Sequence, residues 1–184
     1  GGGGTGGAPN LAGNADQEGG RMTPLPILCF GDSLTAGYYG VWPHTRLGKG
    51  VPRSTEPRFH PYAHRLNTLL SSLSPPLAAE HHGYPGWTAE GLLPELETLL
   101  KRKKWGAAVI LAGSNDVLLN TATPASRAAE HVAALHGACD RHGVRVLVLA
   151  NPDCDTAEFG LVPPGEAAGR RQAIKELGDA VLER

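Results

Sequence analysis

The chain has 184 residues, which is enough for one domain of ordinary size, with 41% hydrophobic and 19% charged residues. Its formal net charge of −1 gives no global electrostatic reason to bind nucleic acid or an anionic membrane. No apolar run reaches the roughly 20 residues that span a bilayer, and three cysteines are too few for a disulfide framework. These features exclude membrane-spanning, coiled-coil and cysteine-stapled proteins.

Residues 1–22 are predicted to form a disordered, glycine-rich tail before a folded domain at 23–184. Nine of the 25 glycines lie in residues 1–20, a segment with one Leu and no aromatic residue. Such a segment buries too little apolar surface to offset the entropy lost on ordering. It also lacks the basic and apolar regions of a secretory signal. With the low cysteine count, this favours a cytoplasmic location.

Strand-like and helix-like segments alternate after the tail. The strands are short, mostly apolar runs closed by turn residues, and the helices carry apolar residues at helical spacing. Thr88 is the expected N-cap of the second helix. In chain order, we expect a strand at 26–30, a loop at 38–59, a helix at 61–73, a strand at 77–82, a helix at 88–104, a strand at 107–112, a helix at 124–142, a strand at 144–150, a loop at 153–168 and a helix at 170–182.

The alternation predicts the fold class. Strands separated by helices favour an α/β fold with three α/β/α layers and a doubly wound, flavodoxin-like parallel sheet. A doubly wound sheet would normally continue from its last helix into another strand, and nothing follows Arg184. We therefore expect the last strand of the sheet to be missing from these residues.

Three polar clusters follow the first three predicted strands. They are Gly31-Asp-Ser-Leu34, Gly83-Tyr-Pro-Gly86 and Gly113-Ser-Asn-Asp116. Open α/β sheets bind ligands at the carboxyl ends of their strands, so these clusters are placed where chemistry is expected. Each cluster alone is a weak signal, but their order along the chain is specific.

In that order, the clusters make the sequence resemble the SGNH hydrolases, also called GDSL esterases and lipases. Residues 27–37 are similar to the first block of that family, 83–88 to the second and 111–116 to the third. The resemblance implies an acyl-enzyme mechanism on a small-molecule ester, with Ser33 as nucleophile and no metal or organic cofactor. It also implies an oxyanion hole made by the backbone N–H groups of Ser33 and Gly86 and by the side-chain amide of Asn115.

The sequence departs from the family at its fourth block, an Asp-x-x-His that supplies the general base and its carboxylate. No Asp-x-x-His occurs anywhere in the 184 residues, and the last histidine is His142. We therefore expect the domain to be incomplete at its C-terminus, which leaves Ser33 a weakly nucleophilic alcohol. His44, His81 and His82 are the first candidates for a substitute base.

Two functions from different classes stay open. The first is a hydrolase of carboxylic esters, and the second is a module that has lost its base and only binds an acyl or acetylated ligand. The retention of Ser33 favours the hydrolase, because a binding module has no chemical need for the hydroxyl. Short-chain esters, thioesters, lysophospholipids and acetylated sugars all fit the motifs equally well.

Several further residues have a plain structural explanation that we prefer. His60 and His64 are four residues apart, and a solvated pair is favoured over a metal site because no third ligand is evident. The basic run at 101–104 is interpreted as cations that complement the dipole at the end of a helix, in preference to a nuclear targeting signal.

Trp42 and Trp87 flank the first two blocks and are candidates for the wall of the substrate pocket.

Overall fold

A computed structural model describes residues 24–39, 58–119, 123–152 and 165–183 of the chain. Most of the expected loop at 153–168, Trp42 and His44 lie outside these residues, as do the expected tail and most of the expected loop at 38–59. The ends of that loop are described and form a two-stranded antiparallel pair, β2 (Tyr38–Tyr39) and β3 (Arg58–Phe59).

In the described part of the chain, the main sheet has four parallel strands in the order β4-β1-β5-β6, which confirms the predicted parallel α/β sheet. This is the strand order expected of a flavodoxin-like sheet. Gly31 lies opposite both Gly83 and Leu111, so three neighbouring strands end at the same level. The strands are β1 (Ile27–Gly31), β4 (Ala79–Gly83), β5 (Ala107–Leu111) and β6 (Arg145–Val148).

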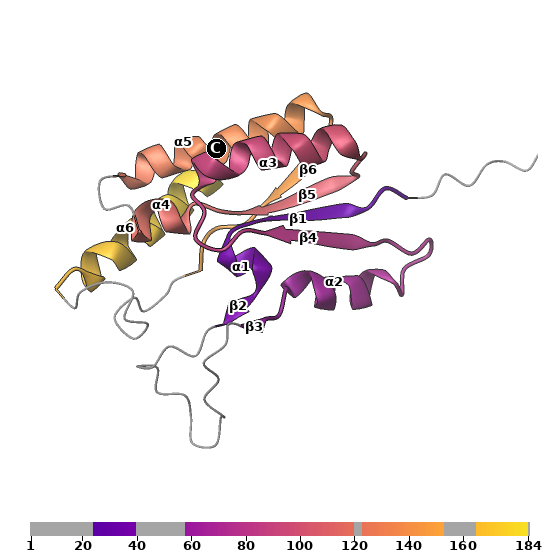
Figure 1. The fold of residues 1–184 in the computed structure, drawn as a ribbon, viewed down its shortest axis with the longest axis horizontal. Helices are drawn as coiled ribbons and strands as arrows, with labels where there is room; N and C mark the ends of the chain where they lie inside the picture. The colour runs from indigo at the N-terminus through magenta and orange to yellow at the C-terminus, as the bar shows by residue number, and fades with distance from the viewer. Residues whose placement is uncertain (1–23, 40–57, 120–122, 153–164, 184) are drawn as a thin grey trace, which may run out of the picture.

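Helices cover both faces of the sheet, as the three-layer prediction requires (Figure 1). The helices α3 and α5 lie on one face with α6 packed against α5, and α2 lies on the other face. Each predicted helix is present, and the structure adds two short ones, α1 and α4, directly after β1 and β5. The helices are α1 (Ser33–Ala36), α2 (Tyr62–Leu70), α3 (Ala89–Arg102), α4 (Ser114–Leu118), α5 (Ala125–Arg141) and α6 (Ala167–Leu182).

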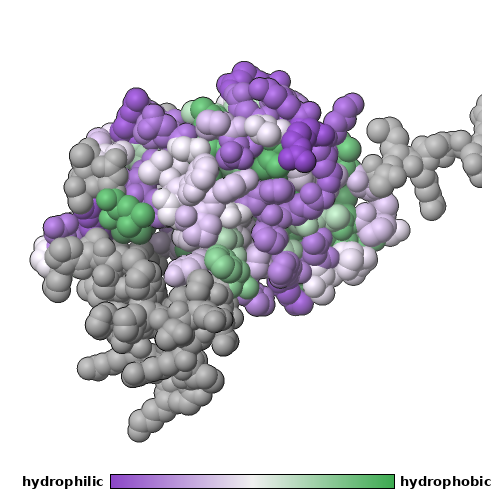
Figure 2. Space-filling view, viewed as in Figure 1, coloured by the Kyte–Doolittle hydropathy of each residue, from purple (hydrophilic) through white to green (hydrophobic). Residues whose placement is uncertain are grey.

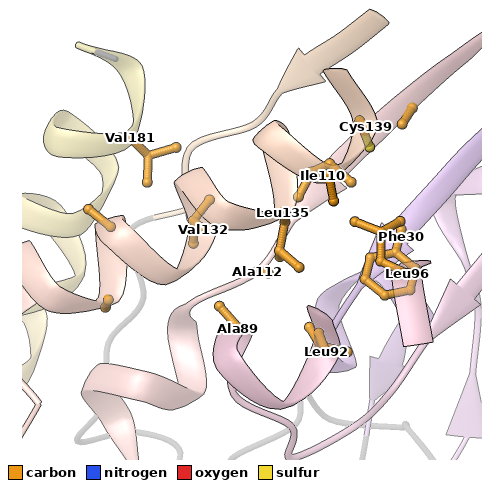
Figure 3. Packing of buried hydrophobic residues seen from close by; sticks show 14 of the residues in the cluster. Phe30, Ala89, Leu92, Leu96, Ile110, Ala112, Val132, Leu135, Cys139 and Val181 are labelled. Carbon is orange, nitrogen blue, oxygen red and sulfur yellow. The ribbon is translucent and has the colours of Figure 1, made fainter. Parts of the chain in front are cut away.

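The larger core lies between the sheet and the α3/α5 layer. Phe30 and Ile110 point from the sheet into this layer, where Leu92 and Leu96 of α3 meet Leu135 of α5 (Figure 3). Successive strand residues face opposite sides, which explains why the strands read as continuous apolar runs when both faces are covered. The core on the α2 face is smaller and contains Cys29, Ala63, Ala79 and Val109.

The outer surface contrasts with this core. Figure 2 shows mainly hydrophilic side chains over the α3 and α5 helices, with small apolar patches scattered across the same view. None of the described helices is both long and apolar enough to cross a membrane. Thr88 accepts a hydrogen bond from the Gly91 N–H at 3.2 Å, which confirms it as the N-cap of α3.

Candidate active site

The three predicted site residues lie at one edge of the sheet, beyond the carboxyl ends of β1, β4 and β5. Ser33 is the first residue of α1, Gly86 lies in the turn between β4 and α3, and Asn115 is the second residue of α4. Hydrogen bonds between the backbones hold these strand ends together, from Tyr84 N to Gly31 O at 2.9 Å and from Asp32 N to Leu111 O at 3.3 Å.

Asp32 fixes the turn that presents Ser33. Its carboxylate is fully buried and accepts hydrogen bonds from the Leu34 backbone N–H at 2.9 Å and from the Ser114 hydroxyl at 2.5 Å. Burial raises the pKa of Asp32, and the hydrogen bonds from Ser114 and Leu34 oppose that rise. The Ser114 bond joins the first and third sequence blocks, which are 82 residues apart.

Gly86 combines a special backbone conformation with open space. Its φ of +82° lies in the left-handed region that side chains disfavour, and a Cβ built there would meet nothing within 4 Å. The backbone of this turn is therefore open on the side where a side chain would stand. Trp87, the next residue, is 43% exposed, and its ring lies 5.3 Å from that of Tyr84.

Asn115 is buried and connects α4 to the turn that contains Gly86. Its side-chain amide donates a hydrogen bond to the Trp87 carbonyl at 2.9 Å. An amide nitrogen carries two N–H groups, and the described residues supply an acceptor for one of them. The Ser114–Asp32 and Asn115–Trp87 bonds together draw the Ser33, Gly86 and Asn115 segments into one network, while the catalytic roles of these residues stay predictions.

The short helix α4 is held from two further sides by side-chain contacts that the sequence did not predict. The Asp116 carboxylate accepts the Ala89 backbone N–H at 2.8 Å and lies 3.1 Å from Nδ1 of His131. At the other end of α4, the buried Arg170 of α6 donates to the Val117 carbonyl at 2.6 Å. Asp116 is the last residue of the third block, whereas nothing local in the sequence marks His131 or Arg170.

No histidine in the described part of the chain has a recorded contact with Ser33. His142 lines a cavity of about 610 Å³ with Leu25 and Trp105, beside the amino ends of the strands and thus at the edge opposite Ser33. His81 lies against His64 of α2, and His82 lies against the Trp105 ring. Nε2 of both His131 and His136 is buried without a described partner.

The rings of His60, His64 and His81 form a row between α2 and β4. Their centroids are 6.2 Å and 5.4 Å apart in that order. In the described ranges, no group of three or more His, Cys, Asp or Glu side chains is arranged to hold a metal ion. All three histidines are exposed on the surface.

Acidification should destabilise the fold through His81 and His136. Burial, followed by the charge on His64, lowers the pKa of His81, and burial also lowers the pKa of His136. The unfolded chain then binds more protons once the pH falls below the ordinary value of about 6.5. The contribution of these two histidines to the free energy of unfolding is fully present above that pH and is lost as the pH falls below it. Urea unfolding should show a lower midpoint at pH 5.5 than at pH 7.5. The H81Q substitution should reduce this difference between the two midpoints. An unchanged difference in H81Q would exclude a contribution from His81.

Comparison with known proteins identifies a family for this chain. The sequence profile of the GDSL-like lipase/acylhydrolase family matches residues 29–183. A comparison with curated protein sequences gives no significant match.

Several solved esterases share the fold. An aryl esterase of M. smegmatis is 20% identical, with a TM-score of 0.66 over 86% of this chain and 78% of that one. A carbohydrate acetylesterase from Sinorhizobium meliloti is 19% identical, with a TM-score of 0.63 over 86% and 78% of the two chains. An SGNH-hydrolase family esterase is 22% identical, with a TM-score of 0.58 over 88% and 72%. At these identities the matches establish the fold.

Proposed function

Because this chain belongs to the GDSL-like lipase/acylhydrolase family, we propose that it hydrolyses carboxylic ester bonds with Ser33 as the nucleophile. The Ser33 hydroxyl oxygen attacks the ester carbonyl, the alcohol leaves with a proton, and water then releases the acid from the acyl-enzyme. The observation that carries this proposal is the network that joins the three strand ends, through the Ser114–Asp32 bond and the Asn115–Trp87 bond.

The negative charge that develops on the carbonyl oxygen is stabilised by three donors. They are the backbone N–H groups of Ser33 and Gly86 and the second N–H of the Asn115 amide. The open space beside Gly86 supports this assignment, since the substrate oxygen must approach the backbone without meeting a Cβ. The neutral amide of Asn115 supports it too, because an Asp at this position could not donate.

Exposed apolar side chains beside the proposed nucleophile indicate the kind of ester. Leu34 and Trp87 are 38% and 43% exposed and adjoin Ser33 and Gly86 in the chain. Apolar walls of this kind bind uncharged acyl or alcohol groups through burial of their surface. We therefore propose a small, uncharged ester as the substrate.

No general base is identified among the described residues, and the test of the proposal is designed around that. No Asp-x-x-His occurs in the 184 residues, and no described histidine has a recorded contact with Ser33. Without a base, the hydroxyl is a poor nucleophile, although binding and oxyanion stabilisation can survive and retain about 10³–10⁴-fold over water. The second function, binding of an acyl or acetylated ligand without turnover, needs no base.

Added imidazole can act as the missing base in a test with p-nitrophenyl acetate. We expect imidazole to increase hydrolysis by the unmodified chain above that of S33A measured at the same imidazole concentration. The difference between the two proteins removes the hydrolysis that imidazole causes by itself. Equal rates for both proteins at every imidazole concentration would reject the hydrolase, and saturable ester binding in that case would support the binding module.

A further inference from the structure

We infer that His131 is a positioning residue for the turn that carries Gly86, and that it acts through the carboxylate of Asp116. This inference deepens the proposed function, because it concerns the arrangement of the proposed oxyanion donors. Three helices take part, since His131 lies on α5, Asp116 on α4 and the end of the turn on α3.

Asp116 has both of its carboxylate oxygens engaged. Oδ2 accepts the Ala89 backbone N–H at 2.8 Å, and Oδ1 lies 3.1 Å from Nδ1 of His131. The Asp116 side chain is 2% exposed, so water cannot readily replace either partner. Ala89 is the first residue of α3, where an N–H has no acceptor within its own helix. In the described structure, Asp116 supplies that acceptor.

His131 fixes the orientation of the Asp116 carboxylate. A carboxylate only accepts hydrogen bonds, so Nδ1 of His131 carries the proton that joins them. The imidazole is 15% exposed, and its other nitrogen is buried without a described partner. The ring therefore has one described polar contact, and that contact is Asp116.

Two consecutive residues of α4 hold the turn at two points. Asn115 donates to the Trp87 carbonyl, and Asp116 accepts from the Ala89 N–H two residues later. Both points lie within three residues of Gly86. A shift of Asp116 would therefore move the Gly86 N–H relative to the Asn115 amide, and a misplacement of about 1 Å can cost on the order of 10²-fold in rate.

The chain offers a matched control on the same helix. His136 is a second partly buried histidine of α5 whose Nε2 is also buried without a described partner, and no described hydrogen bond links it to α4. H131L and H136L therefore remove the same side chain from similar surroundings. H131N keeps an N–H donor near the position of Nδ1 and tests whether donation to Asp116 is what matters.

Amide hydrogen exchange at Ala89 reports the contact directly, because Asp116 is the described acceptor of that N–H. We expect H131L to accelerate Ala89 exchange about 10-fold or more, and H136L to leave it unchanged relative to amides in the middle of α3. With imidazole present, H131L should lower the Ser33-dependent kcat about 10-fold with little change in KM. H131N should recover part of both properties.

The two possible failures are distinguishable. Equal Ala89 exchange in H131L and H136L, or a loss of kcat equal in both, would overturn the positioning role. If Ala89 exchanges faster in H131L but neither the unmodified chain nor any variant shows Ser33-dependent hydrolysis, the link from His131 to the turn is supported and the proposed function is rejected.

Discussion

Replacing Asn115 with Ala should lower Ser33-dependent ester hydrolysis by about 10²–10³-fold, mainly in kcat. The proposed role of the amide is to donate to the oxyanion, a charge that forms only in the transition state. Removal of one such donor therefore affects the chemical step more than binding of the uncharged ester. The rates of the unmodified chain and N115A on p-nitrophenyl acetate, measured at one imidazole concentration and corrected with S33A, give this ratio.

Asn151 provides a matched control for the structural part of the Asn115 contact. Both side chains are nine-tenths buried or more, at 7% and 8% exposed, and each amide donates one hydrogen bond to a backbone carbonyl. The acceptors are Trp87 O at 2.9 Å for Asn115 and Ala112 O at 3.0 Å for Asn151. N115A and N151A should lose similar amounts of stability in urea. A loss of activity as large in N151A would show that Asn115 acts through structure alone.

The framework of the fold could be predicted from local sequence because its signals are local. Runs such as 107–112 are apolar throughout, which is what a strand buried on both faces requires. Thr88 is a good N-cap residue directly before a helical apolar pattern, and it forms the cap. The parallel order of the strands then follows from the helices that separate them.

The small helices α1 and α4 could not be predicted in the same way. Both are short turns that follow a strand, and isolated helices of four or five residues are not stable by propensity. They exist because distant side chains hold them. Asp32 and Ser114 join the two helices, and Arg170 holds the end of α4 from residues far along the chain.

The same reason limits what sequence could reveal about the site. The motifs identified the three strand ends, but the contact between His131 and Asp116 spans a helix–helix packing that no motif spacing contains. Its hydrogen bond depends on how α5 crosses α4, which is set by the core between them. Residues that position a site through tertiary contacts are therefore found only in the folded structure.

Substitution of Gly31 by Ala should have the largest effect on stability, because two strands and a helix meet at this residue. A Cβ at Gly31 would lie 1.8 Å from the Leu111 carbonyl oxygen and 2.6 Å from the Thr35 hydroxyl. The Leu111 carbonyl belongs to β5, the neighbouring strand, and accepts the Asp32 N–H, so it cannot move without breaking the pairing beside the proposed nucleophile. We expect G31A to lose more than about 4 kcal/mol, a large part of a net stability of about 5–15 kcal/mol.

A second glycine-to-alanine variant serves as the control, because it replaces a glycine without creating a steric clash. A Cβ at Gly169, which lies in α6, would meet nothing within 4 Å. Since Ala is favoured over Gly inside a helix by about 0.5–1 kcal/mol, G169A should stabilise the protein slightly. Urea unfolding followed by circular dichroism compares the variants, and G31A should be unfolded or have a much lower midpoint. A midpoint for G31A close to that of the unmodified chain would mean that β1 and β5 can separate at this point. The close packing of the strand ends, on which the proposed site depends, would then be disproved.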